Sequence, residues 1–189
     1  MKKVITLIFT LFLMMGFSHS ALAKGFKVGC SLNYYSPQDS IYKDTYGKGN
    51  FMFGGFLSYE VKVLMNLEFR VEANYFQDKG EMTFSKEEIN FTLTPIVLGL
   101  RFKIIGKKMS PYLGVGIDFC SYKEKLPERF EQVSESTTGF HMEAGSYLNL
   151  TPRFLLDLNI RYSQINAESF DKTLSLGGFR VGIGIVYSF

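Results

Sequence analysis

The sequence closes with the stretch FRVGIGIVYSF, residues 179–189, and this stretch decides the fold class. Its alternate positions are all apolar or aromatic: Phe179, Val181, Ile183, Ile185, Tyr187 and Phe189. The positions between them carry Arg180, two glycines, Val186 and Ser188. Successive side chains of a β-strand point to opposite faces. The segment therefore predicts a strand with one wholly apolar face and one small or polar face.

The same alternation recurs in two other segments, residues 67–76 and 154–163, where charged side chains fill the second face. In a soluble β-sandwich those charged faces would meet water, and the apolar faces would form a core. In a membrane barrel the apolar faces would meet lipid, and the charged faces would line the interior. Alternation alone does not separate these interpretations, so strand number, strand length and connections decide between them.

Eight segments of this character predict eight strands. They span residues 26–35, 51–60, 67–76, 89–103, 112–122, 139–149, 154–163 and 178–189. Several reach the length of about 9–11 residues that a tilted strand needs to cross a bilayer, whereas soluble strands more often have about 5–6 residues. An aromatic content of 16% and 18 glycines also suit sheet better than helix.

Pro95 predicts an irregularity within residues 89–103. Proline lacks the backbone N–H that a strand ladder needs, so we expect a bulge or an unpaired point there. Apolar residues occupy the odd positions 89–93 before Pro95 and the even positions 96–102 after it. We therefore expect the alternation to flip at Pro95, so that both apolar sets lie on the lipid face.

The connections between the predicted strands alternate in length. Residues 61–66, 104–111 and 150–153 are short, whereas 36–50, 77–88, 123–138 and 164–177 are longer and rich in charged residues, Ser, Asp and Gly. Outer-membrane barrels have short periplasmic turns and long external loops. A sandwich gives no reason for this alternation. The sequence therefore predicts an all-β fold, an eight-stranded antiparallel up-and-down transmembrane β-barrel over residues 24–189.

Residues 1–23 predict a cleaved signal peptide, which directs export to the outer membrane. Lys2 and Lys3 precede an apolar run that ends at Phe17, and Ala21-Leu22-Ala23 fits a cleavage site. Two of the 21 basic residues lie in this segment, so the remainder carries 19 basic and 18 acidic residues, a net charge of +1. This balance gives no basis for nucleic-acid binding.

The predicted alternation places many charged residues inside the barrel. The interior positions proposed as a salt-bridge network are Glu68, Arg70, Glu72, Arg101, Asp118, Glu143, Asp157, Arg161 and Arg180, with Lys27 and Glu60 also facing inward. An eight-stranded barrel is only wide enough for its side chains to fill. Buried charges are tolerated when they are paired. We therefore expect a lumen that does not conduct freely.

The remaining candidates receive ordinary interpretations. Aromatic residues near strand ends predict interface girdles: Tyr34, Tyr59, Tyr75, Tyr112, Tyr147, Tyr162, Tyr187 and Phe189.

His141 and Glu143 would face inward but Ser146 outward, so no catalytic triad is expected. Cys30 and Cys120 would lie far apart on opposite faces, so both thiols are predicted free. No cofactor or metal site is predicted. The inward glycines are expected to make room for large charged neighbours or to allow tight curvature.

Several blocks carry a resemblance to a known family. They are Gly54-Gly55-Phe56-Leu57-Ser58-Tyr59, Pro111-Tyr112-Leu113-Gly114-Val115-Gly116, Arg161-Tyr162 and the final Tyr187-Ser188-Phe189. Over residues 24–189 the chain resembles the OmpA/OmpX-like outer membrane protein beta-barrel domain family. The resemblance implies that Tyr187 and Phe189 form a C-terminal assembly signal read by the barrel-assembly machinery.

Three functions follow as hypotheses, with outer-membrane lipid as the surroundings in each. The first is a non-enzymatic structural or surface-interaction protein that binds an extracellular ligand through its long loops. The second is a narrow pore or small-ligand carrier, for which the inward glycines are the only support. The third is a lipid-modifying enzyme, which lacks a credible catalytic set. Fold alone does not choose between them.

Overall fold

The computed structural model describes residues 25–61, 66–81, 87–125, 133–169 and 172–189. The predicted signal peptide, residues 1–23, lies outside them. The strands are β1 (Phe26–Pro37), β2 (Asn50–Val61), β3 (Leu67–Glu81), β4 (Glu88–Lys103), β5 (Met109–Lys125), β6 (Val133–Asn149), β7 (Phe154–Ser169), β8 (Lys172–Ser175) and β9 (Gly178–Ser188). One short helix, α2 (Ser40–Tyr46), lies between β1 and β2.

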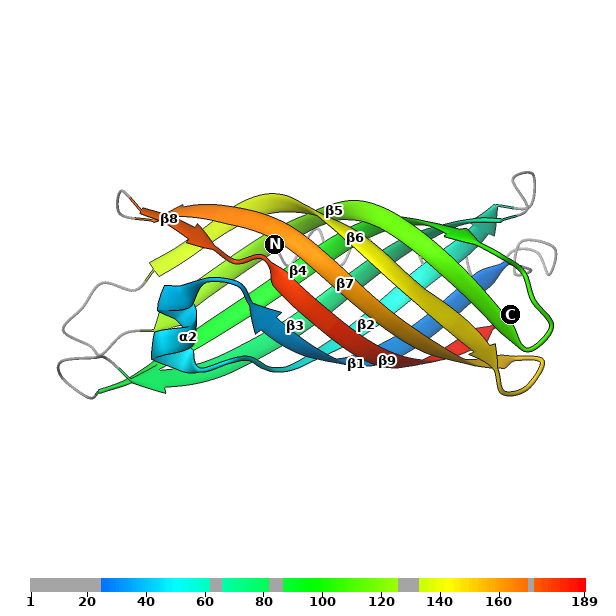
Figure 1. The fold of residues 1–189 in the computed structure, drawn as a ribbon, viewed down its shortest axis with the longest axis horizontal. Coiled ribbons are helices and arrows are strands. Elements are labelled where there is room, and N and C mark those ends of the chain that lie inside the picture. Colours follow the sequence, from blue (N-terminus) through cyan, green and yellow to red (C-terminus); the bar gives the residue numbers. More distant parts are fainter. Residues whose placement is uncertain (1–24, 62–65, 82–86, 126–132, 170–171) are drawn as a thin grey trace, which may run out of the picture.

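The strands close into a single antiparallel barrel (Figure 1). Each long strand pairs with its sequence neighbour, from β1 to β7, and β9 pairs with both β7 and β1. Eight strands therefore complete the ring, and the short β8 adds only a hairpin to the end of β7. The predicted eight-stranded barrel is confirmed, and its closure leaves no unpaired sheet edge within the membrane.

The two ends of the barrel differ (Figure 1). One end carries the short turns that follow β2, β4 and β6, whereas α2 and β8 lie at the other end with the long loops. The strands extend further into those loops than the sequence pattern predicts, since β5 and β6 each have 17 residues. In outer-membrane barrels the short turns face the periplasm and the long loops face the outside.

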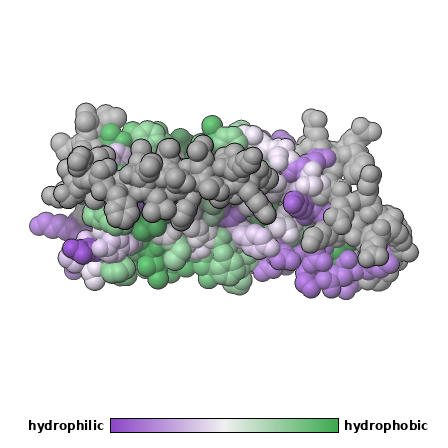
Figure 2. All heavy atoms as spheres, turned by 180° about the vertical axis from the view of Figure 1, so that it is seen from behind, coloured by the Kyte–Doolittle hydropathy of each residue, from purple (hydrophilic) through white to green (hydrophobic). Residues whose placement is uncertain are grey.

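The outer surface between the two ends is apolar. Figure 2 shows a hydrophobic middle with hydrophilic groups gathered towards the ends. The outward side chains include Phe53, Leu113 and Met142, which are 62%, 68% and 63% exposed. Such exposure of large apolar side chains is unfavourable in water and favourable against acyl chains. No helix among the described residues is long and apolar enough to span a membrane.

The predicted flip at Pro95 is wrong. Pairing of β3 with β4 passes from Ala73–Ile96 to Phe76–Leu93, so the ladder is interrupted opposite Pro95 but keeps its register. Pairing of β4 with β5 continues through Pro95 without a shift. The alternation of faces is therefore unbroken. Leu93 and the odd positions before it point into the barrel and are buried, whereas Ile96 points outward.

The girdle prediction is wrong for two of its tyrosines. Tyr34, Tyr75 and Phe189 are exposed on the outer surface. Tyr112 and Tyr147 are instead 2% exposed and lie inside the barrel. Their hydroxyl groups donate hydrogen bonds to Asp157 and Glu68, respectively, partners that only the interior supplies.

The two cysteines are free, as predicted. Cys30 is exposed on the outer face of β1, and Cys120 is buried on the inner face of β5. The alternation of each strand separates them, because one side chain faces the lipid and the other faces the lumen.

Candidate functional site

The lumen contains two layers of different chemistry, which follow each other along the barrel axis. We call the first the charged layer: Lys27, Glu60, Glu68, Arg70, Glu72, Arg101, Lys103, Glu143, Asp157, Arg161 and Arg180. We call the second the aromatic cap: Tyr35, Tyr42, Tyr46, Met52, Phe76, Phe91, Leu93, Cys120, Tyr122, Ile165 and Leu176. The charged layer begins at the short turns, and the cap lies beneath the long loops.

Arg101 is the centre of the charged layer. Its Nε and Nη2 donate to the two carboxylate oxygens of Glu143 at 2.6 and 3.0 Å. Its Nη1 donates to the hydroxyl of Tyr147 at 2.6 Å and to Asp157 at 3.3 Å. The guanidinium also lies over the ring of Tyr112, 4.1 Å from its centroid. A fully buried arginine is thus satisfied on all sides.

A glycine lets this ion pair form. Arg101 on β4 and Glu143 on β6 are separated by β5, where Gly114 is the register partner of both. A Cβ at Gly114 would lie 2.8 Å from Cγ of Glu143 and 3.1 Å from Cγ of Arg101. The absent side chain therefore provides the space through which the two side chains meet. This agrees with the prediction that inward glycines make room for large neighbours.

Glu72 joins three arginines on the other side of the lumen. It accepts from Nε of Arg70 at 2.9 Å and from Nη2 of Arg161 at 3.1 Å, and Nη2 of Arg180 lies 3.1 Å from it. Arg161 also donates to Glu143 at 2.8 Å. Glu72 and Glu143 therefore link the arginines of β3, β4, β7 and β9 into one connected set across the barrel.

The end of the charged layer at the short turns is closed by lysines. Lys27 lies 2.5 Å from Glu68 and 3.2 Å from Glu60, and Lys103 lies 2.5 Å from the same Glu60 carboxylate. Each lysine of this mouth is therefore neutralised by a carboxylate. The sequence prediction missed Lys103, although its odd position in β4 places it on the same inner face as Arg101.

Asp118 is the predicted network residue whose ion pair is with a histidine and not with an arginine. Its carboxylate contacts Nδ1 of His141 at 2.9 Å, and both groups are buried. Nε2 of His141 has no protein partner among the described residues. Ser146 belongs to the outward positions of β6, where its register partner is Leu158 on β7. The Ser–His–Asp geometry needed for nucleophilic catalysis is therefore not assembled from these residues.

The aromatic cap fills the lumen towards the loops. Phe91 on β4 is 2% exposed and is surrounded by rings. Its centroid lies 5.3 Å from that of Tyr42, 5.5 Å from Tyr46, 6.2 Å from Tyr122 and 6.4 Å from Phe76. These are ordinary spacings for packed aromatic pairs. The sequence placed Phe91 on the lipid face, so the cap was not predicted.

Helix α2 carries two of the cap rings and ties the outer loops together. The carboxylate of Asp39 accepts from the backbone N–H of Tyr42 at 3.2 Å and from that of Ser175 at 3.0 Å, so the helix N-cap is also bonded to β8. Tyr42 donates its hydroxyl to Asp78 at 2.9 Å, and Tyr46 donates to Glu124. Burial raises the pKa of the Tyr42 phenol, which keeps its proton available for donation.

A small cavity lies inside the described part of the barrel. A cavity of about 20 Å³ lies between the two layers, lined by Leu93 and Ile165 of the cap and by Asp118, Ser163 and Arg180. Nε of Arg180 has no protein partner among the described residues. A volume of this size admits about one water molecule, and the polar lining suits it.

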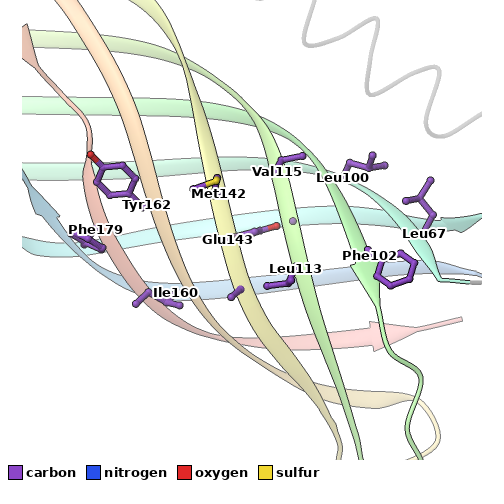
Figure 3. A pocket seen from close by; sticks show the side chains of 12 residues that line it. Leu67, Leu100, Phe102, Leu113, Val115, Met142, Glu143, Ile160, Tyr162 and Phe179 are labelled. Carbon is purple, nitrogen blue, oxygen red and sulfur yellow. The ribbon is translucent and has the colours of Figure 1, made fainter.

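A second hollow lies on the outer surface (Figure 3). Its lining includes Phe102, Leu113, Met142 and Ile160, which point towards the lipid. Glu143 also contributes, but its carboxylate is bound by Arg101 and Arg161. The hollow is therefore part of the lipid-facing surface, and its chemistry suits acyl chains rather than a polar ligand.

A closed antiparallel barrel with an apolar outer belt, a packed lumen and long loops at one end defines a small integral outer-membrane barrel protein. The outer membrane protein beta-barrel domain family matches residues 7–189, and the chain belongs to that family. This confirms the family resemblance of the sequence. No curated protein matches the sequence.

Solved structures of small outer-membrane barrels share the fold. OprG from Pseudomonas aeruginosa aligns with a TM-score of 0.69 at 14% identity, covering 88% of this chain and 97% of OprG. Neisserial surface protein A aligns with a TM-score of 0.64 at 18% identity, covering 88% and 98%. Outer membrane protein W of E. coli aligns at 0.56 and 13% identity, covering 88% and 98%. At these identities the likeness concerns the fold alone.

Proposed function

We propose that this protein is a sealed, non-enzymatic outer-membrane barrel that acts through its outer loops, as a structural or surface-interaction protein. The observation that carries the proposal is the double closure of the lumen. Paired charges fill the part next to the short turns, and packed rings fill the part beneath the loops. A solute would have to displace both layers in order to pass.

The chemistry of the interior supports a non-catalytic role. Among the described residues, no group of three or more His, Cys, Asp or Glu side chains could hold a metal ion. The carboxylates of Glu68, Glu72, Glu143 and Asp157 are held by arginines or lysines, so none is available as a base for a substrate. The surface left for recognition is therefore the outer rim.

Planar-bilayer recording tests the sealed lumen. The wild-type protein should give no steady conductance. Either layer closes the lumen by itself, so Tyr42→Ala/Phe91→Ala in the cap should stay silent, as should Arg101→Ala/Glu143→Ala in the charged layer. The variant that combines all four substitutions should conduct. It serves as the positive control, because its conductance would show that the assay detects an opened barrel. Stable conductance from wild-type monomers would favour a narrow pore and refute the proposal.

The outer loops are the proposed binding surface. A solved complex of Ail from Yersinia pestis, 17% identical with a TM-score of 0.51, contains the heparin analogue sucrose octasulfate. Immobilised heparin is therefore a reasonable first probe, beside extracellular-matrix proteins. Cells that display the wild-type barrel should bind at least one of these surfaces more than cells that display a variant with residues 123–138 replaced by a Gly/Ser linker. Equal binding would count against the attachment role, leaving a structural one.

The final strand is proposed to carry the assembly signal. Tyr187 and Phe189 form an edge-to-face pair, with centroids 5.0 Å apart, and Phe189 is exposed. Phe189→Ala should slow insertion in cells, where machinery reads the strand, but not refolding into pure lipid vesicles. Phe102→Ala, which changes an exposed aromatic near the same end of the barrel on β4, is the matched control. Equal insertion of both variants in cells would contradict the assignment.

A further inference from the structure

At the short-turn end of the barrel, the two described turns carry exposed charges of one sign. Lys107 and Lys108, in the turn between β4 and β5, are exposed, as is Arg153, in the turn between β6 and β7. The acidic residues at this end that the structure describes, Glu60 and Glu68, are already bonded to Lys27 and Lys103 within the mouth. The outward charge of these two turns is therefore positive. We call Lys107, Lys108 and Arg153 the basic turn rim.

The backbone holds the basic turn rim in place. The backbone N–H of Asn149 donates to the carbonyl of Lys108 at 3.0 Å, and its side-chain amide donates to the carbonyl of Lys107 at 2.8 Å. The two turns are thus bonded to each other. Nη1 of Arg153 lies 3.4 Å from the hydroxyl of Tyr187, which the guanidinium can reach as a donor. The three cations therefore share one side of the rim.

Apolar side chains accompany these cations. Ile104, Ile105, Met109 and Leu150 are 64%, 62%, 52% and 59% exposed, and they belong to the same two turns or border them. Neighbouring large apolar side chains that are exposed together are unfavourable in water. In a membrane the apolar groups enter the acyl region, and the lysine and arginine ends rise to the level of the lipid phosphates.

We propose that the basic turn rim binds anionic phospholipid headgroups in the periplasmic leaflet of the outer membrane. Arginine offers two parallel N–H donors to a phosphate, and lysine offers a point charge. A soluble polyanion would be attracted by the same charges but would gain nothing from the neighbouring isoleucines. The external end presents no such uniform charge among its described residues, since Lys43 adjoins Asp44 and Lys79 pairs with Glu88. The proposal is independent of whether the lumen is sealed.

Electron spin resonance with spin-labelled lipids tests this selectivity. The full barrel is reconstituted in phosphatidylcholine vesicles, and the motionally restricted fraction is compared for labelled phosphatidylglycerol and labelled phosphatidylcholine. Wild type should prefer phosphatidylglycerol by about fivefold, the scale of one basic residue at a charged membrane surface. The preference should fall at high salt, because screening weakens exposed charges.

Two variants decide the outcome. Lys107→Gln/Lys108→Gln/Arg153→Gln should lose the preference, whereas Lys43→Gln/Lys48→Gln/Lys123→Gln, which removes three exposed cations from the external end, should keep it. All substituted residues are exposed, so both variants should fold. Absence of any preference, or its retention in the first variant, would overturn the proposal. The proposal would also be overturned if the barrel showed no lipid selectivity but co-sedimented with purified peptidoglycan sacculi, and if this co-sedimentation were lost in the variant Lys107→Gln/Lys108→Gln/Arg153→Gln.

Discussion

The charged layer and the aromatic cap occupy the same inner face of the same strands, yet their chemistry is opposite. On β4, Arg101 reaches into a set of ion pairs, and ten residues earlier Phe91 packs among rings. Both occupy odd positions of one uninterrupted strand. The difference shows that the inner face of this barrel is not defined by polarity. Its polarity is instead opposite to that of the outer face. Near the short turns the outer face is apolar and the inner face is charged, and beneath the long loops the outer face is polar and the inner face is aromatic.

Within the membrane, β4 turns Ile96 and Leu98 outward, and its inner face carries Arg101 and Lys103 beyond the buried Val97. Beyond the membrane the strand is surrounded by water, and the arrangement inverts. Thr92 and Asn90 then point outward, while Phe91 is buried. The part of the barrel beneath the long loops is therefore built like a soluble sheet with an apolar core. The inversion of hydrophobicity near Pro95 is therefore a change in what the two faces of β4 carry and not a change in backbone register.

The largest expected effect is in the charged layer. Arg101→Met should destabilise the barrel by about 3–5 kcal/mol, because it leaves buried carboxylates without their cation. Urea unfolding in phospholipid vesicles measures this loss. Arg153→Met, at an exposed turn position, is the control and should change little. A loss below about 1 kcal/mol for Arg101→Met would show that the ion pairs are not needed for closure.

The same layer predicts strong coupling between partners. Arg101→Met combined with Glu143→Leu replaces both charges by apolar groups of similar size. Replacing a whole buried pair is often neutral. The double variant should therefore recover part of the loss, and a double-mutant cycle should show a coupling above about 1 kcal/mol. Additive losses would contradict a direct pair in the folded barrel.

The next effect concerns the cap. Phe91→Ala should cost about 3 kcal/mol, since it opens a cavity among buried rings. The damage should stay local, because the rings around Phe91 belong to α2 and to the cap and not to the charged layer. Hydrogen exchange should accelerate at the α2 amides but not at β3 residues 67–73. Phe53→Ala, on the lipid face, should leave α2 exchange unchanged. Equal acceleration throughout the barrel would show that the two layers unfold as one unit.

A smaller effect tests the space beside Arg101. Gly114→Ala should cost about 2 kcal/mol, because the new methyl group meets the side chains of Glu143 and Arg101 at sub-contact distances. Gly55→Ala is a matched control, since its Cβ would meet only one atom within 4 Å, at 3.9 Å. Urea unfolding in vesicles distinguishes them. Equal stability of the two variants would mean that the ion pair shifts without cost.

The smallest effect concerns a single hydrogen bond of α2. Tyr42→Phe removes the donor to Asp78 while keeping the ring, so the helix should lose about 1 kcal/mol of local stability. Asn50 still donates to the other carboxylate oxygen of Asp78, at 3.3 Å, which limits the loss. Hydrogen exchange of α2 measures it. Tyr75→Phe, which removes an exposed hydroxyl bonded to Gln77, should have no effect on α2.

Much of the charged layer was predictable because charged residues alternate with apolar ones in segments long enough to cross a membrane. This pattern placed Arg70, Glu143 and Arg161 on the inner face. The same reasoning, applied consistently, would have placed Tyr112 and Lys103 there, because their strand positions have the inward parity. The cap was not predictable in this way, since Phe91 and Leu93 carry the apolar pattern of a lipid face.

The sequence by itself determined the eight strands that close the barrel and, except for the residues before Pro95 on β4, which alternate positions share a face, because these properties depend on a period of two residues and on local length. Only the tertiary structure decided what each face touches. Contacts such as Arg101 with Glu143 and Tyr42 with Asp78 join different strands and loops. They depend on where the membrane ends and on which side chains closure of the ring brings together, and neither is encoded in local alternation.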